Sequence, residues 1–220
     1  MLRVRNSTLI APSLMAANML YLKDEVQAVE VAGADWLHLD IMDGHFVPNL
    51  TFGPDIISQL RPICSLPFDV HLMVEPVELC IDLYQKAGAD HITIHIEATT
   101  DLRKNLNTIK KLGCRAGVSI KPETSVNQIK DFLNAVDQVL VMSVNPGFYG
   151  QAFIPSVLEK ITVLKRIREE QGLSFDIVVD GGINVQNASS IIEAGADVLV
   201  AGSSVFKQPD YKKAINSLRG

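Results

Sequence analysis

The sequence predicts an α/β protein, a single-domain (β/α)8 TIM barrel over residues 1–220. The first reason is a repeat: Ala-Gly-Ala-Asp occurs at 32–35, 87–90 and 194–197, and each copy leads directly into a β-rich run. The copies begin 55 and 107 residues apart, close to two and four units of about 27 residues, and the chain holds about eight such units. The second reason is a strict alternation of strand and helix patterns, which indicates a parallel sheet.

Taken in order, the β-rich runs are Leu9 to Ser13, Trp36 to Met42, Phe68 to Met73, His91 to His95, Arg115 to Ile120, Gln138 to Ser143, Asp176 to Asp180 and Val198 to Gly202. The helical patterns between and after them are Tyr21 to Ala32, Ile56 to Leu60, Val77 to Lys86, Leu102 to Leu112, Ser125 to Leu133, Val157 to Gln171, Ala188 to Glu193 and Gln208 to Gly220. The glycine of each Ala-Gly-Ala-Asp copy suits a left-handed helix end, so each copy predicts a helix-to-strand turn. No Gly-x-Gly-x-x-Gly follows the first run, which disfavours the alternative of an open, dinucleotide-binding sheet.

Composition argues against several classes of protein. A formal net charge of -5 is unlike that of a nucleic-acid binder, and no apolar run reaches the roughly 18 residues that span a bilayer. The three cysteines, Cys64, Cys80 and Cys114, are odd in number and scattered, so we expect reduced thiols and no disulfide framework. We therefore predict a soluble cytoplasmic protein whose partners are neither nucleic acids nor membranes.

Four polar residues fall near the C-terminal ends of predicted strands, where barrels of this class carry their active sites. His38 and Asp40 share one face of the second run, His71 lies late in the third, and Asp180 ends the seventh. Two imidazoles and two carboxylates suit one divalent cation, with Zn²⁺, Fe²⁺, Mn²⁺ and Co²⁺ as candidates. Each residue taken alone is equally well explained as a polar member of the barrel interior, but four at one rim favour a site.

Asp40 and Asp180 are the candidate catalytic residues. They come from different parts of the ring, so they can reach a central substrate from opposite sides. One carboxylate would remove a proton from a carbon next to a carbonyl, and the other would return a proton to the opposite face. The cation would stabilise the charge that develops in between. The predicted reaction is an epimerisation.

Glycine-rich segments follow the last three predicted strands: Asn145-Pro-Gly147-Phe148-Tyr149-Gly150, Asp180-Gly181-Gly182 and Gly202-Ser203-Ser204. Small residues let backbone N–H groups approach a phosphate closely, and barrels of this class commonly hold phosphate in the loops after strands 7 and 8. Met42, Met73 and Met142 fall near the ends of their strands, where they would line the site or fill the barrel.

On these residues the sequence resembles the ribulose-phosphate 3-epimerase family over nearly its whole length. The resembling segments are Ala11 to Ser13, His38 to Asn49, Asp69 to Val74, Val141 to Gly147, Val179 to Asn184 and Ala201 to Ser203. The resemblance implies a barrel of the ribulose-phosphate-binding type and a reversible, metal-dependent conversion of D-ribulose 5-phosphate to D-xylulose 5-phosphate through an enediolate. It places this isomerase in the pentose phosphate pathway, with a small sugar phosphate as its partner. We also expect a homo-oligomer.

Residue by residue, the resemblance implies that one divalent metal ion is bound by His38, Asp40, His71 and Asp180, of which the two aspartates are also the acid/base pair. Ser13 and His71 would contact substrate, and substrate or phosphate binding would involve Gly147, Phe148, Tyr149, Gly150, Asp180, Gly181, Gly182, Gly202 and Ser203. Tyr149 departs from the family's usual Gly-Phe-Gly-Gly. Ser13-Leu-Met15 is also similar to the D-allulose-6-phosphate 3-epimerases, which stay the alternative, while Gly181-Gly182-Ile183 favours the pentulose enzymes.

Three further classes fit the residues less well. A phosphosugar or nucleotide decarboxylase of similar fold would carry Asp-x-Lys at a strand end, where this chain has His38-Leu-Asp40. An aldolase forming a Schiff base at Lys121 would not need the metal ligands. A phosphate-binding barrel without catalysis would need neither the metal nor the acid/base pair.

Overall fold

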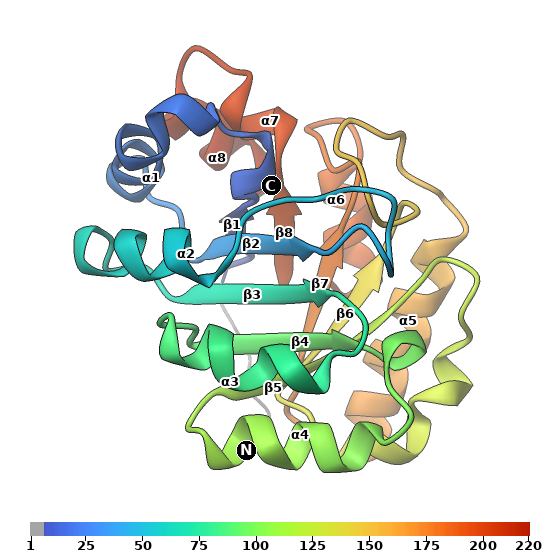
Figure 1. Ribbon diagram of the computed structural model, residues 1–220. Helices are drawn as coiled ribbons and strands as arrows, with labels where there is room; N and C mark the ends of the chain where they lie inside the picture. Colours follow the sequence, from blue (N-terminus) through green and yellow to red (C-terminus); the bar gives the residue numbers. More distant parts are fainter. Residues whose placement is uncertain (1–6) are drawn as a thin grey trace.

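The computed structural model describes residues 7–220, and their eight parallel strands form one barrel with helices around its outside (Figure 1). The strands are β1 (Leu9–Pro12), β2 (Leu37–Met42), β3 (Phe68–Met73), β4 (His91–His95), β5 (Arg115–Ile120), β6 (Gln138–Met142), β7 (Asp176–Asp180) and β8 (Val198–Ala201). Neighbouring strands run in the order β1-β8-β7-β6-β5-β4-β3-β2, and a parallel bridge between Ser13 and His38 joins the two ends of the sheet. The predicted (β/α)8 barrel is confirmed.

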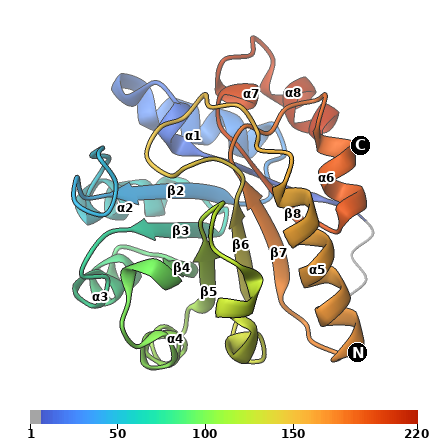
Figure 2. The same cartoon turned by 90° about the vertical axis from the view of Figure 1, so that its right-hand side faces the viewer.

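The connecting helices surround this sheet (Figure 2). They are α1 (Leu22–Val31), α2 (Pro54–Leu60), α3 (Glu78–Lys86), α4 (Leu102–Lys111), α5 (Val157–Glu170), α6 (Ala188–Ala194), α7 (Ser203–Phe206) and α8 (Tyr211–Leu218). Short 3-10 helices fill other connections: η1 (Leu14–Ala16), η2 (Met19–Tyr21), η3 (Arg61–Ile63), η4 (Ile96–Ala98), η5 (Val126–Gln128) and η6 (Lys130–Phe132). Gly33, Gly88 and Gly195 end α1, α3 and α6 with φ of 91°, 108° and 122°, so the predicted helix-to-strand turns are confirmed.

Two predicted helices differ in the structure. Residues 125–133 form η5 and η6 in place of one α-helix, and the Ser125 hydroxyl accepts from the backbone N–H of Asn127. Val126, Asn127, Ile129 and Asp131 are weak α-helix formers, so the segment closes with the tighter 3-10 turns, which explains the error. The closing helix begins only at Tyr211, because the Asp210 carboxylate caps it by accepting from the N–H of Lys213 at 2.9 Å.

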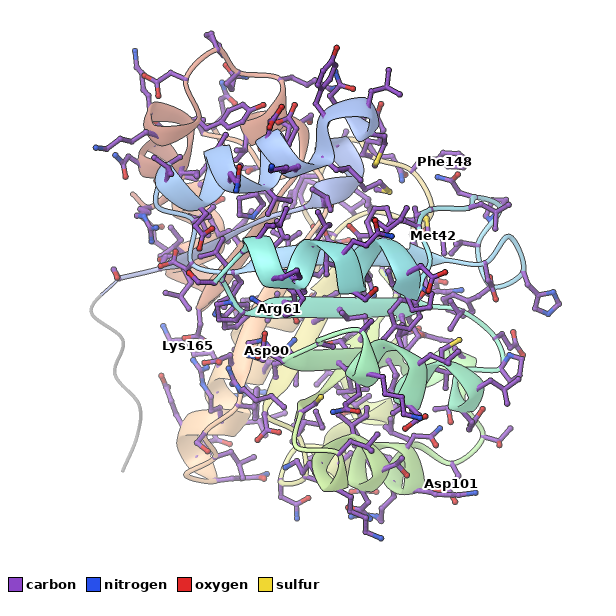
Figure 3. The ribbon with its side chains drawn as sticks, turned by 60° about the vertical axis from the view of Figure 1, so that its left-hand side comes forward. Met42, Arg61, Asp90, Asp101, Phe148 and Lys165 are labelled. Carbon is purple, nitrogen blue, oxygen red and sulfur yellow. The ribbon has the colours of Figure 1, made fainter. Side chains whose placement is uncertain are left out.

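The aspartate of each Ala-Gly-Ala-Asp copy closes the N-terminal end of the barrel. Each carboxylate accepts the backbone N–H near the start of a neighbouring strand at 2.7–2.8 Å. Each also pairs with an arginine, in the pairs Asp35–Arg219, Asp90–Arg61 and Asp197–Arg168. Figure 3 shows Arg61 and Asp90 at this end, while Met42 and Phe148 lie toward the other. The aspartates of the repeat therefore stabilise the N-terminal end of the barrel, away from the C-terminal strand ends where the predicted site residues lie.

The barrel interior is divided into an apolar and a polar half. The apolar half comes mainly from β1, β6, β7 and β8, with Ala11, Leu140, Met142, Val178, Val198 and Val200. The polar half comes from β2, β3 and β4 and consists of buried His38, Asp40, Asp69, His71, His91, Thr93 and His95. The alternate residues of β2 to β4, such as Leu39, Val70 and Ile92, belong to the main core beneath the helices. Among the described residues, no helix is long and apolar enough to cross a bilayer.

Candidate active site

A cavity of about 650 Å³ opens at the C-terminal ends of the strands. The predicted site residues in its wall are Ser13, Asp40, Met42, Met73, Met142, Gly147, Phe148, Tyr149, Gly150, Asp180, Gly181, Gly182, Gly202 and Ser203. His38 and His71 are fully buried beside Asp40, outside the cavity wall. The structure therefore brings the residues singled out in the sequence to one end of the barrel.

His38, Asp40, His71 and Asp180 each offer one ligand atom, and these atoms lie within 4.8 Å of one another. Oδ1 of Asp40 lies 3.3 Å from Nε2 of His38 and 3.2 Å from Nδ1 of His71. Both nitrogens lie 3.9 Å from Oδ2 of Asp180. Asp40 and His71 are register partners of the β2–β3 ladder, so adjacent strands present them side by side.

Asp69, on β3, orients the ring of His38. Its Oδ2 lies 2.8 Å from Nδ1 of His38, and both side chains are fully buried. Gln138 donates its Nε2–H to the other oxygen of Asp69 at 2.7 Å. Because an ionised carboxylate only accepts, the His38 proton lies on Nδ1, and a neutral ring turns the Nε2 lone pair toward Asp40. Within the described part of the chain, this buried Nε2 has no hydrogen-bond partner.

The two aspartates have opposite electrostatic surroundings. Burial alone would raise the pKa of Asp40, but His38 and His71 hold it well below its usual range. Burial and the charge of Asp40 raise the pKa of Asp180 to about 7. Burial would lower the pKa of His38, yet Asp40 and Asp69 raise it well above its ordinary value. Of the two carboxylates, only Asp180 can therefore hold a proton near neutral pH.

The four ligand atoms fit a divalent cation. When the histidine protons lie on the outward nitrogens, all four atoms facing the common centre are electron-pair donors. Donors at this spacing repel one another unless positive charge lies between them. Two imidazole nitrogens and two carboxylate oxygens suit Zn²⁺, Fe²⁺, Mn²⁺ or Co²⁺, and the unpartnered Nε2 of His38 supports a bound ion in particular.

Ser13 fixes the second oxygen of Asp40. Its hydroxyl donates to Oδ2 at 2.5 Å, while Oδ1 faces the histidines. The Thr51 hydroxyl donates to the backbone carbonyl of Asp40 at 2.7 Å. The carboxylate is therefore held in one orientation at the floor of the cavity.

Hydrogen bonds hold the loop of residues 145–151 in place beside the cavity. Asn49 donates its side-chain N–H to the carbonyl of Gly147 at 2.6 Å, and Gln151 donates to the carbonyl of Phe148 at 2.8 Å. Phe148 and Tyr149 are each about half exposed. Tyr149, the departure from the family pattern, thus lies at the mouth of the cavity.

The loops after β7 and β8 contact their neighbours through backbone atoms. A Cβ on Gly182, whose φ is +64°, would lie 2.4 Å from the backbone nitrogen of Phe153. The Ser204 hydroxyl donates to the carbonyl of Ile183 at 2.6 Å and so links the two loops. Gly202 directly precedes α7, which begins at Ser203. Small residues are required here because backbone segments approach each other closely.

Sequence reasoning missed three groups that support the site: the buried Asp69 and His95 and the partly buried Glu97. His95 contacts His71, and Glu97 contacts His95. Burial lowers the pKa of His95 to about 4, so its ring is neutral at pH 7. Burial would raise the pKa of Glu97, but His95 and neighbouring N–H and O–H donors lower it to about 2. His38 and Asp40 were identified because they alternate with apolar residues. The same alternation links Asp69 to His71 and His95 to Glu97 in the sequence, so it could have identified Asp69, His95 and Glu97 as well.

Comparison with known proteins gives a consistent result. A model of the "Ribulose-phosphate 3 epimerase family" matches residues 9–206. The chain is 48% identical over 212 residues to a ribulose-phosphate 3-epimerase of Bacillus subtilis, covering 96% of this chain and 98% of the relative. It is 44% identical to that of Escherichia coli K12, covering 96% and 94%. The chloroplastic ribulose-5-phosphate-3-epimerase of Arabidopsis thaliana is 46% identical, covering 98% and 77%.

Among solved structures, the fold is similar to a tryptophan synthase α-subunit from Pyrococcus furiosus, with a TM-score of 0.72 at 15% identity, covering 96% and 97% of the two chains. A thiamine phosphate pyrophosphorylase from the same organism gives a TM-score of 0.64 at 18% identity, covering 96% and 93%. At this identity the likeness concerns the barrel alone.

Proposed function

Since the chain belongs to the ribulose-phosphate 3-epimerase family, we infer that it is an isomerase that interconverts D-ribulose 5-phosphate and D-xylulose 5-phosphate by inverting carbon 3. Its curated relatives are named for ribulose phosphate. The six-carbon alternative, allulose 6-phosphate, is therefore not favoured. An enzyme with this reaction belongs to the carbohydrate epimerases, a class of isomerases.

One observation supports the mechanism most directly: the ligand atoms of His38, Asp40, His71 and Asp180 lie within 4.8 Å of one another. We propose that these four residues hold one divalent cation, through Nε2 of His38, Nδ1 of His71 and one oxygen of each aspartate. When bound, the cation supplies the positive charge that stabilises negative charge developing on the sugar oxygens. The ion is one of Zn²⁺, Fe²⁺, Mn²⁺ and Co²⁺.

Asp40 and Asp180 are the proposed proton carriers. Each is part of the cavity wall, and they belong to different strands, β2 and β7. One carboxylate removes the proton from carbon 3, which leaves an enediolate, and the other protonates the opposite face. In the reverse direction the two roles are exchanged. Ser13, hydrogen-bonded to Asp40, both orients this carboxylate and is available to the substrate.

The phosphate of the substrate is proposed to bind at the other end of the cavity. Gly181, Gly182, Gly202 and Ser203 belong to the cavity wall. Gly147 to Gly150 and the methionines Met42, Met73 and Met142 also line the cavity. Phosphate binding by backbone N–H groups needs small residues and no lysine.

The test is to incubate metal-loaded protein with D-ribulose 5-phosphate in heavy water and to follow the products by NMR. The expected result is D-xylulose 5-phosphate carrying deuterium at carbon 3, and removal of the metal with a chelator abolishes it. Allulose 6-phosphate is tested in parallel. Fast conversion of the hexulose without conversion of the pentulose would overturn the proposed substrate, and no turnover of either would overturn the proposed activity.

We also propose that the chain forms a homo-oligomer in the cytoplasm. Large apolar side chains are exposed beside the cavity mouth, namely Met19, Leu20, Tyr21, Leu50, Phe148 and Tyr149. A cluster of this kind is more often an interface than open surface. The three cysteines are unpaired, as in a reducing compartment. Light scattering of the wild type and of Leu20→Glu tests the oligomer, because the charged variant should dissociate; a monomeric wild type would contradict it.

A further inference from the structure

Two buried histidines and the partly buried Glu97 form a line that leads away from the proposed cation site. Nε2 of His71 lies 2.9 Å from Nε2 of His95, on the adjacent strand β4. Nδ1 of His95 lies 2.9 Å from Oε2 of Glu97, in η4. His71 and His95 are fully buried, so neither ring exchanges these partners for water. The proposed mechanism does not use His95 or Glu97.

Glu97 can only accept a hydrogen bond from His95. Its other oxygen, Oε1, accepts from the backbone N–H of Lys121 at 2.9 Å and from the hydroxyl of Thr124. Two donors therefore converge on one oxygen, as expected for an ionised carboxylate. The proton between Glu97 and His95 consequently lies on Nδ1 of His95.

The remaining protons follow from this assignment. Neutral His95 carries one N–H, and because it is on Nδ1, Nε2 is an acceptor. The contact with His71 then requires that Nε2 of His71 be the donor. Nδ1 of His71 is left with a lone pair, and it lies 3.2 Å from Oδ1 of Asp40 and 3.9 Å from Oδ2 of Asp180. The lone pair therefore faces the proposed cation site.

We infer that His95 and Glu97 are positioning residues that hold His71 in the tautomer able to ligate the cation. The inference rests on the proposed metal site. The tautomer of His38 is fixed by one residue, because Asp69 accepts a hydrogen bond from its Nδ1 directly. His71 requires two residues because it presents Nδ1 inward and its outward Nε2 meets a histidine. A ligand histidine with a fixed tautomer needs no rearrangement of protons when the cation binds.

The substitution Glu97→Gln tests whether the hydrogen bond from His95 to Glu97 determines the tautomer of His71. The N–H of Lys121 still requires an acceptor, so the amide oxygen of Gln stays on that side and its NH₂ group faces Nδ1 of His95. The proton of His95 then moves to Nε2, where it donates to Nε2 of His71. His71 must now carry its proton on Nδ1 and loses the inward lone pair. We expect the Kd for Co²⁺ to rise about 10- to 100-fold, measured by absorbance titration.

Glu78→Gln is the matched control. Glu78, on α3, also accepts two side-chain hydrogen bonds through one oxygen, from Asn105 at 2.7 Å and Thr99 at 3.2 Å, but none of its hydrogen bonds involves His95. The same chemical change there should leave the Kd within about twofold of wild type. A Glu97→Gln protein that is folded by circular dichroism and binds Co²⁺ as tightly as this control would overturn the inference.

A second measurement needs no variant. In ¹⁵N-labelled wild-type protein with Zn²⁺ added, imidazole NMR shifts should show His95 protonated on Nδ1 and His71 protonated on Nε2. The reverse pattern would overturn the inference even if Glu97→Gln failed to fold. If the wild type binds no cation, the proposed metal site fails, and the same spectrum of the metal-free protein still decides the tautomer of His95.

Discussion

Nδ1 of His38 lies 2.8 Å from Oδ2 of Asp69, and both side chains are buried at the centre of the barrel. Asp69 does not line the cavity, yet it decides which nitrogen of His38 faces Asp40. A carboxylate placed behind a ligand histidine fixes the ring tautomer and increases the basicity of the inward nitrogen.

The first prediction concerns this contact. In Asp69→Asn the amide oxygen should stay with Gln138, which donates to Oδ1 at 2.7 Å, so that the new NH₂ group faces His38. The proton of His38 then moves to Nε2, and the Kd for Zn²⁺ or Mn²⁺ should rise about 10- to 100-fold by calorimetry. Asp82→Asn, at an exposed pair with Lys86, is the control. Equal affinities in the two folded variants would show that Asp69 does not act through His38.

The second prediction concerns the proposed proton carriers. Asp40→Asn and Asp180→Asn each remove one proton acceptor while keeping the size of the side chain. Each should reduce kcat by about 10²- to 10⁴-fold. Binding of inorganic phosphate should change little, because the proposed phosphate site is formed by other residues. Near-wild-type turnover of D-ribulose 5-phosphate by both variants would rule out the two-base mechanism.

The third prediction concerns pH. In the metal-free protein, burial and Asp40 raise the pKa of Asp180 to about 7. Below pH 7 the cation must displace the proton of Asp180 and a proton of His38, whose pKa is also raised. Affinity should therefore fall more than about tenfold per pH unit as pH decreases, and the dependence should weaken above pH 7, where Asp180 is already ionised. Calorimetry at pH 6 in buffers of different ionisation enthalpy should show proton release on binding, with less release in Asp180→Asn. Unchanged affinity between pH 5 and 7 would contradict the prediction.

The fourth prediction compares two glycines with nearly the same φ angle. Gly172 has φ of +62°, and apart from its chain neighbours no heavy atom of residues 7–220 lies within 4 Å of where its Cβ would be, whereas a Cβ on Gly182, with φ of +64°, would meet the backbone of Phe153. Gly172→Ala should cost only the left-handed strain, about 1–2 kcal/mol of unfolding free energy.

Gly182→Ala should show the same strain and also displace the two loops over the cavity. Its kcat/KM should fall about 10- to 100-fold. Thermal unfolding and steady-state kinetics of both variants separate the two effects. Similar kcat/KM values in the two would show that this close backbone contact does not matter for the substrate.

Much of the architecture could be predicted because its causes are local. The period of two in Leu37 to Met42 and the repeated helix-ending glycines are read directly along the chain, and both proved correct. The segment 125–133 was predicted as an α-helix because Val126, Ile129 and Leu133 have helical spacing, but it forms two 3-10 turns because several of its residues are weak α-helix formers.

The barrel could be predicted from the amino-acid sequence, and so could the rim at which His38, Asp40, His71 and Asp180 gather, because alternation and repeat spacing specify which strand end each residue occupies. Which nitrogen of each histidine faces the common centre, and which aspartate can keep a proton, could be learned from the packed barrel alone. The orientation of the two rings depends on Asp69, His95 and Glu97. Two of the contacts join neighbouring strands, at 2.8 and 2.9 Å, and the third joins His95 to Glu97 of η4 at 2.9 Å. The position of a histidine proton depends on the geometry of its hydrogen-bond partner, and the shift of a pKa depends on burial and nearby charge. Both arise only when the strands are packed together.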